Sequence, residues 1–184
     1  TWRAYLESHT QQVPEILRMR LLHAVQASVD MLHEDPRWFV ATASYRDQAN
    51  YIAVHSVNMA VLSMAVGNRL EFGRKALMNL GMSALYADSG MRRLADSLNA
   101  PTEEEEEALI SHPYRSVMEI LESPALTRAQ RDRILVAYEH HIGMDGSGFP
   151  QAIPGKPKHL FSHIVTLADR YDELCSDRPG QEAL

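Results

Sequence analysis

Residues 139–150 read Glu139-His140-His141-Ile142-Gly143-Met144-Asp145-Gly146-Ser147-Gly148-Phe149-Pro150, in which two adjacent histidines lead into a glycine-rich turn. Neighbouring residues do not share a face of a regular helix, so both imidazoles can reach one ion only where a helix ends. The glycines supply the backbone freedom for such a turn. A second interpretation stays open: two solvated histidines at a helix C-terminus, where they suit the negative end of the helix dipole.

The chain has the size and composition of one globular domain. Its 184 residues are 45% hydrophobic and 23% charged, which is typical of folded proteins. A formal charge of -6 argues against a general electrostatic grip on nucleic acid. Cys175 is the only cysteine, which excludes an internal disulfide and a cysteine-rich zinc site and favours a cytoplasmic location. No apolar run approaches the roughly 18 residues that span a bilayer, so we expect no membrane span.

Apolar residues recur at helical spacing in four segments, and no alternating strand-like pairs are evident. The four stripes are Leu22, Val25, Val29 and Leu32; Val54, Val57, Val61 and Met64; Leu77, Gly81 and Ala84; and Leu160, Ile164, Leu167, Tyr171 and Leu174. The apolar stripe of an amphipathic helix faces the core. The sequence therefore predicts an all-α domain.

Two local signals predict helix boundaries. Thr127 and Gln130 match the capping box, in which each side chain bonds a free backbone amide at a helix start. His112 precedes Pro113, and the residue before a proline is driven away from helical geometry. We therefore expect one helix to begin near residue 128 and another to be interrupted at 112–113.

Imidazoles and carboxylates also occur in segments far from 139–150. Asp88 continues the apolar face of Leu77, Gly81 and Ala84, where an unpaired charge would be unfavourable, so a cation or a helix dipole must compensate it. Taken alone, His55 also fits a hydrogen-bonded core histidine, and Asp169 an ion pair with Arg170. Taken together, the candidates offer donors that suit iron, manganese or zinc: His55, Asp88, His112, His140, His141 and Asp169.

The order and spacing of four segments resemble the HD-GYP family. These segments are Tyr86-Ala87-Asp88-Ser89-Gly90, His112-Pro113, residues 139–150 and Ala168-Asp169-Arg170-Tyr171-Asp172. The family is an all-α branch of the metal-dependent HD phosphohydrolases, and its known members hydrolyse the bacterial second messenger cyclic di-GMP at a two- or three-metal site. The resemblance implies a single domain over 1–184, an HD-domain-like helical bundle with its core at 49–179 and extra N-terminal helices within 1–48 packed on it.

The resemblance also implies a role for each candidate residue. Asp88 would bridge the metals and take part in activating a water, His112, His140 and His141 would complete one ion, and His55 and Asp169 would serve the neighbouring ion. The residues implied to contact the substrate are Asp145, Gly146, Ser147, Gly148, Phe149, Pro150 and Arg178. The cofactor implied is a divalent transition metal, iron, manganese or zinc.

Several positions depart from the family's pattern. Ala87 stands in place of the histidine before the bridging aspartate, and Tyr51 in place of a glutamate that many members use for a third metal. Met91 replaces a lysine, Ile142 a glutamate, and Phe149 the tyrosine of the name-giving motif. These changes favour one ion, at Asp88, His112, His140 and His141, or none.

Three functional hypotheses follow from the resemblance and its departures. The leading one is a degenerate domain in cyclic di-GMP signalling, with impaired or absent phosphodiesterase activity, that binds the nucleotide or a signalling protein. The second is an active phosphodiesterase with an unorthodox dimetal site. The third is a helical interaction module that binds neither metal nor nucleotide.

Overall fold

The computed structural model describes residues 15–47, 50–91, 103–122 and 126–176, and this part of the chain is helical and contains no strand. The all-α prediction is confirmed. The helices are α2 (Glu15–Glu34), α3 (Pro36–Ala41), α4 (Tyr51–Arg69), α5 (Arg74–Ala87), α6 (Glu103–Leu121), α7 (Arg128–Glu139) and α8 (Leu160–Cys175), with the short 3-10 helices η1 (Thr42–Ser44) and η3 (Ser89–Met91).

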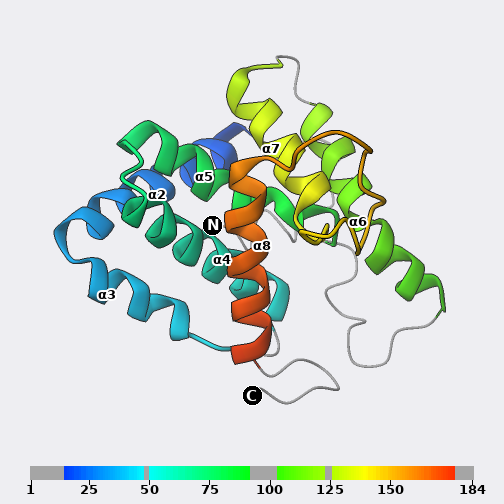
Figure 1. Ribbon diagram of the computed structural model, residues 1–184. Coiled ribbons are helices and arrows are strands. Elements are labelled where there is room, and N and C mark those ends of the chain that lie inside the picture. Colours follow the sequence, from blue (N-terminus) through cyan, green and yellow to red (C-terminus); the bar gives the residue numbers. More distant parts are fainter. Residues whose placement is uncertain (1–14, 48–49, 92–102, 123–125, 177–184) are drawn as a thin grey trace.

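Helices α4 and α5 form the centre of the bundle (Figure 1). Helix α8 lies across α4, while α7 packs on α5, and α6 packs on η3 and α7. A side-chain carbon at Gly81 of α5 would lie 2.6 Å from the sulfur of Met64 in α4, so the Met64 side chain packs directly on the backbone of α5 at this glycine. Because α7 packs on both α5 and α8, the C-terminal ends of α5 and α7 lie close to each other and to α8.

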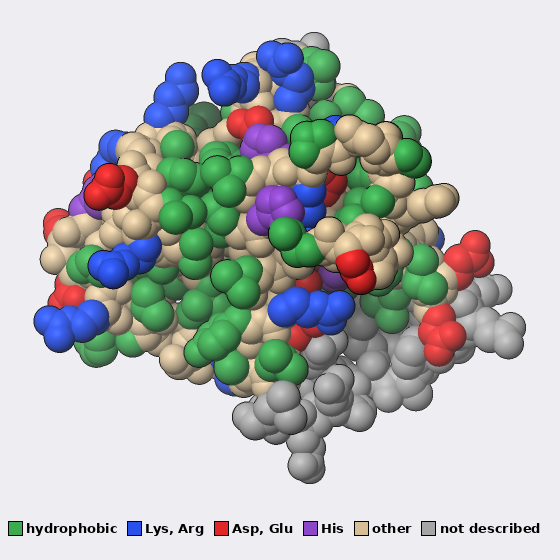
Figure 2. All heavy atoms as spheres, in the orientation of Figure 1, with side chains coloured by type: hydrophobic (Ala, Val, Ile, Leu, Met, Phe, Trp, Pro, Cys, Tyr) green, Lys and Arg blue, Asp and Glu red, His purple; other side chains and the backbone are tan. Residues whose placement is uncertain are grey.

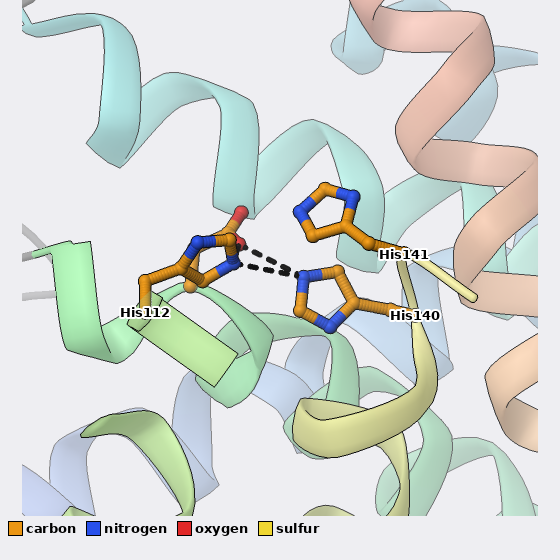
Figure 3. Close-up of side chains that lie close together, drawn as sticks. His112, His140 and His141 are labelled. Atoms are coloured by element: carbon orange, nitrogen blue, oxygen red, sulfur yellow. Dashed lines mark hydrogen bonds and ion pairs between the residues drawn. The ribbon is translucent and has the colours of Figure 1, made fainter. Parts of the chain in front are cut away.

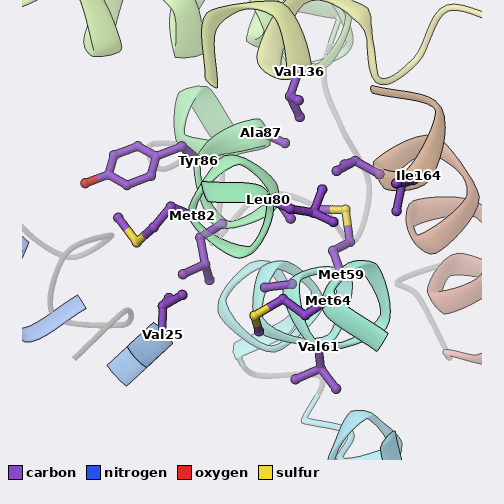
Figure 4. Close-up of a cluster of buried hydrophobic side chains, with 14 of the residues drawn as sticks. Val25, Met59, Val61, Met64, Leu80, Met82, Tyr86, Ala87, Val136 and Ile164 are labelled. Carbon is purple, nitrogen blue, oxygen red and sulfur yellow. The ribbon is translucent and has the colours of Figure 1, made fainter. Parts of the chain in front are cut away.

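The core lies where α2, α4, α5, α7 and α8 meet (Figure 4). Val25, Met64 and Leu80 are almost fully buried there, and α2 and α3 pack on the central helices as expected of N-terminal helices. Three residues predicted for the core lie at its edge. Leu21 is buried in place of Leu22, Val54 is half-buried, and Val57 is 41% exposed. The division of the chain at 48–49 stays a prediction.

The apolar stripe predicted to face the core is wrong for α8. Ile164 is buried, but the other four members are between 46% and 61% exposed and lie on a surface where hydrophobic side chains gather (Figure 2): Leu160, Leu167, Tyr171 and Leu174. The buried face instead combines Ile164 with small and polar residues: Ser162, Val165, Ala168, Asp169 and Asp172. The carboxylates can be buried because they meet polar partners on α4.

The capping box is confirmed, but the predicted interruption at Pro113 is wrong. The amide of Gln130 donates to Thr127 Oγ1 at 3.2 Å, and the amide of Thr127 donates to Gln130 Oε1 at 2.9 Å. Pro113 lies inside α6. Its missing N–H leaves the Leu109 carbonyl without its usual helical donor, and His112 Nδ1 donates to that carbonyl at 2.5 Å. The helix therefore continues, and the bond orients an imidazole.

None of the described helices is both long and apolar enough to cross a membrane.

Candidate metal centre

Asp88 lies at the end of α5 and is 2% exposed. Its Oδ1 is 3.3 Å from His112 Nε2 of α6 and 3.2 Å from His140 Nε2, just after α7, and the two nitrogens are 3.2 Å apart (Figure 3). One ligand atom from each of these three residues and from His141 all lie within 4.8 Å of one another. Residues separated by more than 50 positions thus form one buried donor set.

The Nδ1 atoms of His112 and His140 point toward backbone carbonyls. His112 Nδ1 lies 2.5 Å from the Leu109 oxygen, and His140 Nδ1 lies 3.1 Å from the Val136 oxygen and 3.0 Å from the Ala137 oxygen. Nδ1 must therefore carry a hydrogen in each neutral ring, and Nε2 keeps its lone pair. Both lone pairs face Asp88 Oδ1, which is buried and has no hydrogen-bond donor in the described part of the chain. This arrangement calls for a cation.

A second group of donors adjoins the first. His55 Nε2 of α4 is 3.5 Å from Asp88 Oδ2 and 3.2 Å from Asp169 Oδ1 of α8. His141 Nδ1 is 3.4 Å from Asp169 Oδ2, an oxygen that also has no hydrogen-bond donor in the described region. The six residues predicted as ligands therefore lie in one buried cluster, with Asp88 shared between its two halves.

The charges in this cluster depend on one another. Burial disfavours a protonated His55, but the carboxylates of Asp169, Asp172 and Asp88 outweigh it and raise the pKa of His55 to about 10. Burial likewise disfavours an ionised Asp88, but His112 and His140 hold the pKa of Asp88 well below its usual range. The pKa of His140 is also raised, because Asp88 outweighs the effect of burial. Without an ion, protons on His55 and His140 therefore balance the carboxylates, and metal binding would release protons.

His141 has the opposite balance. Burial, followed by the neighbouring His140 and His112, lowers the pKa of His141 well below its ordinary value. The ring of Phe149 packs against it, with 4.6 Å between ring centroids. His141 therefore stays neutral, which is the protonation state that a metal ligand requires.

Asp172 is a part of the centre to which the sequence analysis assigned no role. Its Oδ2 accepts from His55 Nδ1 at 2.8 Å and its Oδ1 accepts from Asn58 Nδ2 at 2.9 Å, both in the interior. Arg46 NH1 lies 3.5 Å from Asp172 Oδ1. The available signal was its spacing, because Asp172 follows Asp169 by three residues and shares its helix face. The carboxylate fixes the ring of His55, in the way that carboxylates orient metal-binding histidines in other proteins.

We expect Asp172→Asn to weaken the binding of an ion at His55 by roughly tenfold, the lower end of the effect of removing a hydrogen-bond partner of a metal ligand. The asparagine oxygen can still accept from His55 Nδ1, but the negative charge that supports the ring is lost. Titration of the metal-free protein with manganese measures the change. Glu173→Gln, which alters a neighbouring carboxylate paired with Arg170 at 3.0 Å, should leave the affinity as it is. Equal affinities for the two variants would contradict this role.

The glycine-rich segment forms a closed turn beside His141. Ile142 and Gly148 form an isolated β-bridge, and the Gly143 amide donates to the Ser147 carbonyl at 2.7 Å. Asp145 Oδ1 accepts from the Ser147 amide and hydroxyl, at 3.0 and 2.6 Å. Residues 145–148 are exposed, whereas Phe149 faces the histidines and Pro150 is buried. Arg178, the other residue implied to contact substrate, lies outside the described residues.

Comparison with known proteins agrees with this architecture. Residues 26–184 match the family model described as HD domain, HD_5. The chain belongs to the HD domain family. Its motifs and relatives also confirm the resemblance to HD-GYP domains.

The relatives are phosphodiesterases of bacterial signalling nucleotides. The chain is 27% identical to "Cyclic di-GMP phosphodiesterase PdeB" of Borreliella burgdorferi, over 71% of this chain and 34% of that protein. It is 29% identical to "Cyclic di-GMP phosphodiesterase response regulator RpfG" of Xanthomonas campestris pv. campestris, over 91% of this chain and 44% of that protein. The chain thus spans less than half the length of these relatives.

A solved structure shares the fold. Bd1817, an HDG"Y"P protein from Bdellovibrio bacteriovorus, superposes with a TM-score of 0.69 at 19% identity, over 83% of this chain and 50% of that one. The prediction of an HD-type helical bundle is confirmed.

The departures from the HD-GYP pattern have definite places in the structure. Ala87 is fully buried in the same apolar cluster as Val136 and Ile164 (Figure 4), and it carries no ligand atom. Tyr51 stacks on the ring of His55, with 5.4 Å between centroids. Ile142 is buried, and Met91 packs partly buried against the core. These four side chains therefore offer no imidazole, carboxylate or ammonium group at positions where the resemblance implies one.

Proposed function

We propose that this chain is a degenerate HD-GYP-type domain of cyclic di-GMP signalling, with one divalent transition metal and impaired or absent phosphodiesterase activity. Its role would be regulatory, through the nucleotide or a signalling protein. The proposal is supported by the donor cluster, by the departures around it, and by relatives that are cyclic di-GMP phosphodiesterases. The cytoplasmic location expected from the sequence stays a prediction.

One observation carries the metal part of the proposal. Asp88 Oδ1, His112 Nε2 and His140 Nε2 lie 3.2 to 3.3 Å from one another and are all acceptors when the rings are neutral. A single proton can bridge only two of these atoms, whereas one metal ion can bond all three. The residues that would hold the ion are Asp88, His112, His140 and His141.

Iron, manganese and zinc suit this mixture of imidazole and carboxylate donors. When bound, such an ion supplies Lewis acidity, which neutralises charge on a phosphodiester and makes water a stronger acid. In the absence of an ion, His112 and His140 outweigh burial and hold the pKa of Asp88 low, so Asp88 would offer an ionised carboxylate to the metal. The exposed turn at 145–148 can line one side of a bound nucleotide.

The second half of the cluster is the reason to propose impaired catalysis. His55 and Asp169 lie beside Asp88, but position 87 contributes only a methyl group to the apolar core. Removing a hydrogen-bond partner of a metal ligand typically lowers metal affinity by roughly 10–100-fold. Removing the ligand itself should lower the affinity for a second ion by at least as much. Phosphoryl chemistry that depends on two ions would slow accordingly.

The decisive experiment measures bound metal and cyclic di-GMP hydrolysis for the purified chain after reconstitution with iron(II), manganese(II) or zinc(II). We expect about one tightly bound ion per chain and slow or no turnover. Brisk turnover would instead establish the active phosphodiesterase, which the convergence of His55, Asp88 and Asp169 favours. A chain that binds neither metal nor cyclic di-GMP would be a helical interaction module.

Restoring the missing donor tests the assignment of position 87. We expect Ala87→His to raise metal occupancy and to permit slow hydrolysis, because the imidazole adjoins Asp88. The larger ring must also displace apolar contacts, which should lower stability by about 1–3 kcal/mol. Metal analysis and thermal unfolding measure the two effects. Ala84→His, at another fully buried alanine of α5, controls for overpacking, and equal occupancy in both variants would show that position 87 does not face the ion.

A further inference from the structure

The paired histidines require an unusual backbone, since both rings must face Asp88 from adjacent positions. Helix α7 ends at Glu139, and His140 still has helical angles, with φ -63° and ψ -25°. The carbonyl groups of His140 and Ile142 flank His141 on the two sides. His140 and Ile142 follow the last helical residue, so their carbonyls have no intrahelical donor, and the groups that bond them restrain the backbone that carries the two histidine side chains.

Two residues from the start of α8 and the segment before it bond these carbonyls. Thr166 Oγ1 lies 2.5 Å from the His140 carbonyl oxygen and 2.8 Å from the Ser162 carbonyl oxygen, and its single hydrogen can be donated to one of them at a time. Lys158 Nζ donates to the Ile142 carbonyl at 2.5 Å and to Thr166 Oγ1 at 2.7 Å. Lys158 and Thr166 therefore join the backbone on both sides of His141 in one hydrogen-bonded chain.

The same segment is anchored at Glu139, the last residue of α7. Its buried carboxylate Oε2 accepts from the His159 amide at 2.9 Å and from the Ser162 hydroxyl at 2.7 Å. The start of α8 is thus bound to the end of α7 independently of the ligands. Lys158 and Thr166 are held on an anchored element, so their bonds can restrain residues 140–142.

Lys158 is itself partly buried, and burial lowers the pKa of its ammonium group. A cation near the C-terminus of a helix interacts favourably with the helix dipole and with the free carbonyls. Because the partly buried Lys158 donates to the Ile142 carbonyl and to Thr166 Oγ1, it restrains the backbone at this turn.

We propose that Lys158 and Thr166 are positioning residues, which hold residues 140–142 in the conformation that directs His140 and His141 together toward Asp88. This role rests on the metal binding proposed above. Removing an outer partner of a metal ligand lowers affinity by roughly 10–100-fold, and a backbone restraint shared by two ligands should have an effect in that range. A role in stability alone would leave the ligand geometry unaltered.

The test compares Lys158→Met, Lys158→Arg and Thr166→Val with the unaltered chain, using cobalt(II) as the probe. We expect Lys158→Met and Thr166→Val to bind cobalt about tenfold more weakly and to change its visible absorption bands, which report ligand geometry. Lys158→Arg should restore both, because the guanidinium can donate to the same carbonyl. Lys75→Met is the matched control, since Lys75 is an exposed lysine in the first turn of α5, at the opposite end of that helix from Asp88.

A second measurement needs no metal. Nitrogen-15 NMR of the imidazoles in the metal-free chain should show that Nδ1 of His140 carries a hydrogen-bonded proton. In Lys158→Met, the imidazole nitrogen signals of His140 and His141 should shift and broaden. Unaltered cobalt spectra, affinity and imidazole signals in Lys158→Met would overturn the positioning role. If the unaltered chain binds no cobalt, the metal proposal fails, and the imidazole signals still decide whether Lys158 orders the pair.

Discussion

Asp88→Asn should reduce metal binding to the background level, with a loss of affinity of more than about 100-fold, since removing only an outer-shell partner costs about 10–100-fold. Asp88 contacts both halves of the cluster, through His112 and His140 on one side and His55 on the other. Asparagine keeps the shape of the side chain but removes the charge that faces the lone pairs. Metal analysis after gel filtration measures the change.

Asp30→Asn is the control for this substitution. Asp30 is an exposed carboxylate of α2 that pairs with Arg74, remote in sequence from every residue of the centre. Its replacement should leave metal content unchanged. If Asp88→Asn retained the metal content of the unaltered chain, Asp88 would not be a ligand, and the lone pairs of His112 and His140 would have to be balanced by protons alone.

Gly148→Ala should both destabilise the chain and weaken metal binding. Gly148 has φ +91°, a conformation that costs an L residue roughly 1–2 kcal/mol. A Cβ at this position would also overlap the carbonyl oxygen of His141, so the backbone of a proposed ligand must move. We expect the free energy of unfolding to fall by about 2 kcal/mol or more and manganese affinity to fall about tenfold. Chemical denaturation and metal titration measure these effects.

Gly155→Ala separates the two causes. Gly155 also has a positive φ, +75°, but a Cβ there would meet nothing within 4 Å in the described part of the chain. This variant should show the conformational penalty without any loss of metal affinity. If Gly148→Ala and Gly155→Ala behaved alike in the metal titration, the close approach of Gly148 to His141 would have no bearing on the centre.

Much of the architecture was predictable from local patterns. Helical periodicity predicted the all-α class, and the capping box of Thr127 and Gln130 predicted the start of α7, because both signals arise from interactions within a few residues. The four spaced motifs identified the family and hence six residues that the structure brings together. The residue types and their order along the chain were sufficient to identify these six candidates, because a metal centre requires nitrogen and oxygen donors whatever their separation in the sequence.

Other features depend on contacts that local patterns do not encode. Pro113 continues α6 because the ring of His112 bonds the carbonyl that proline cannot reach. The apolar stripe of α8 faces outward because its opposite face brings Asp169 and Asp172 to His55. Leaving a buried charge without a partner costs more free energy than exposing a leucine to solvent. Asp172 and Lys158 likewise acquire their roles only from residues that are distant in sequence.

The primary structure alone therefore determines the helical class, the family and the set of donor atoms, because periodicity, capping and motif order are properties of neighbouring or aligned residues. Tertiary structure decides which helix faces are buried, which nitrogen of each histidine faces Asp88, and how the adjacent His140 and His141 come to point the same way. The physical reason is that hydrogen bonds and burial join segments that are far apart in the chain, and the energy of a buried polar group depends on its partner.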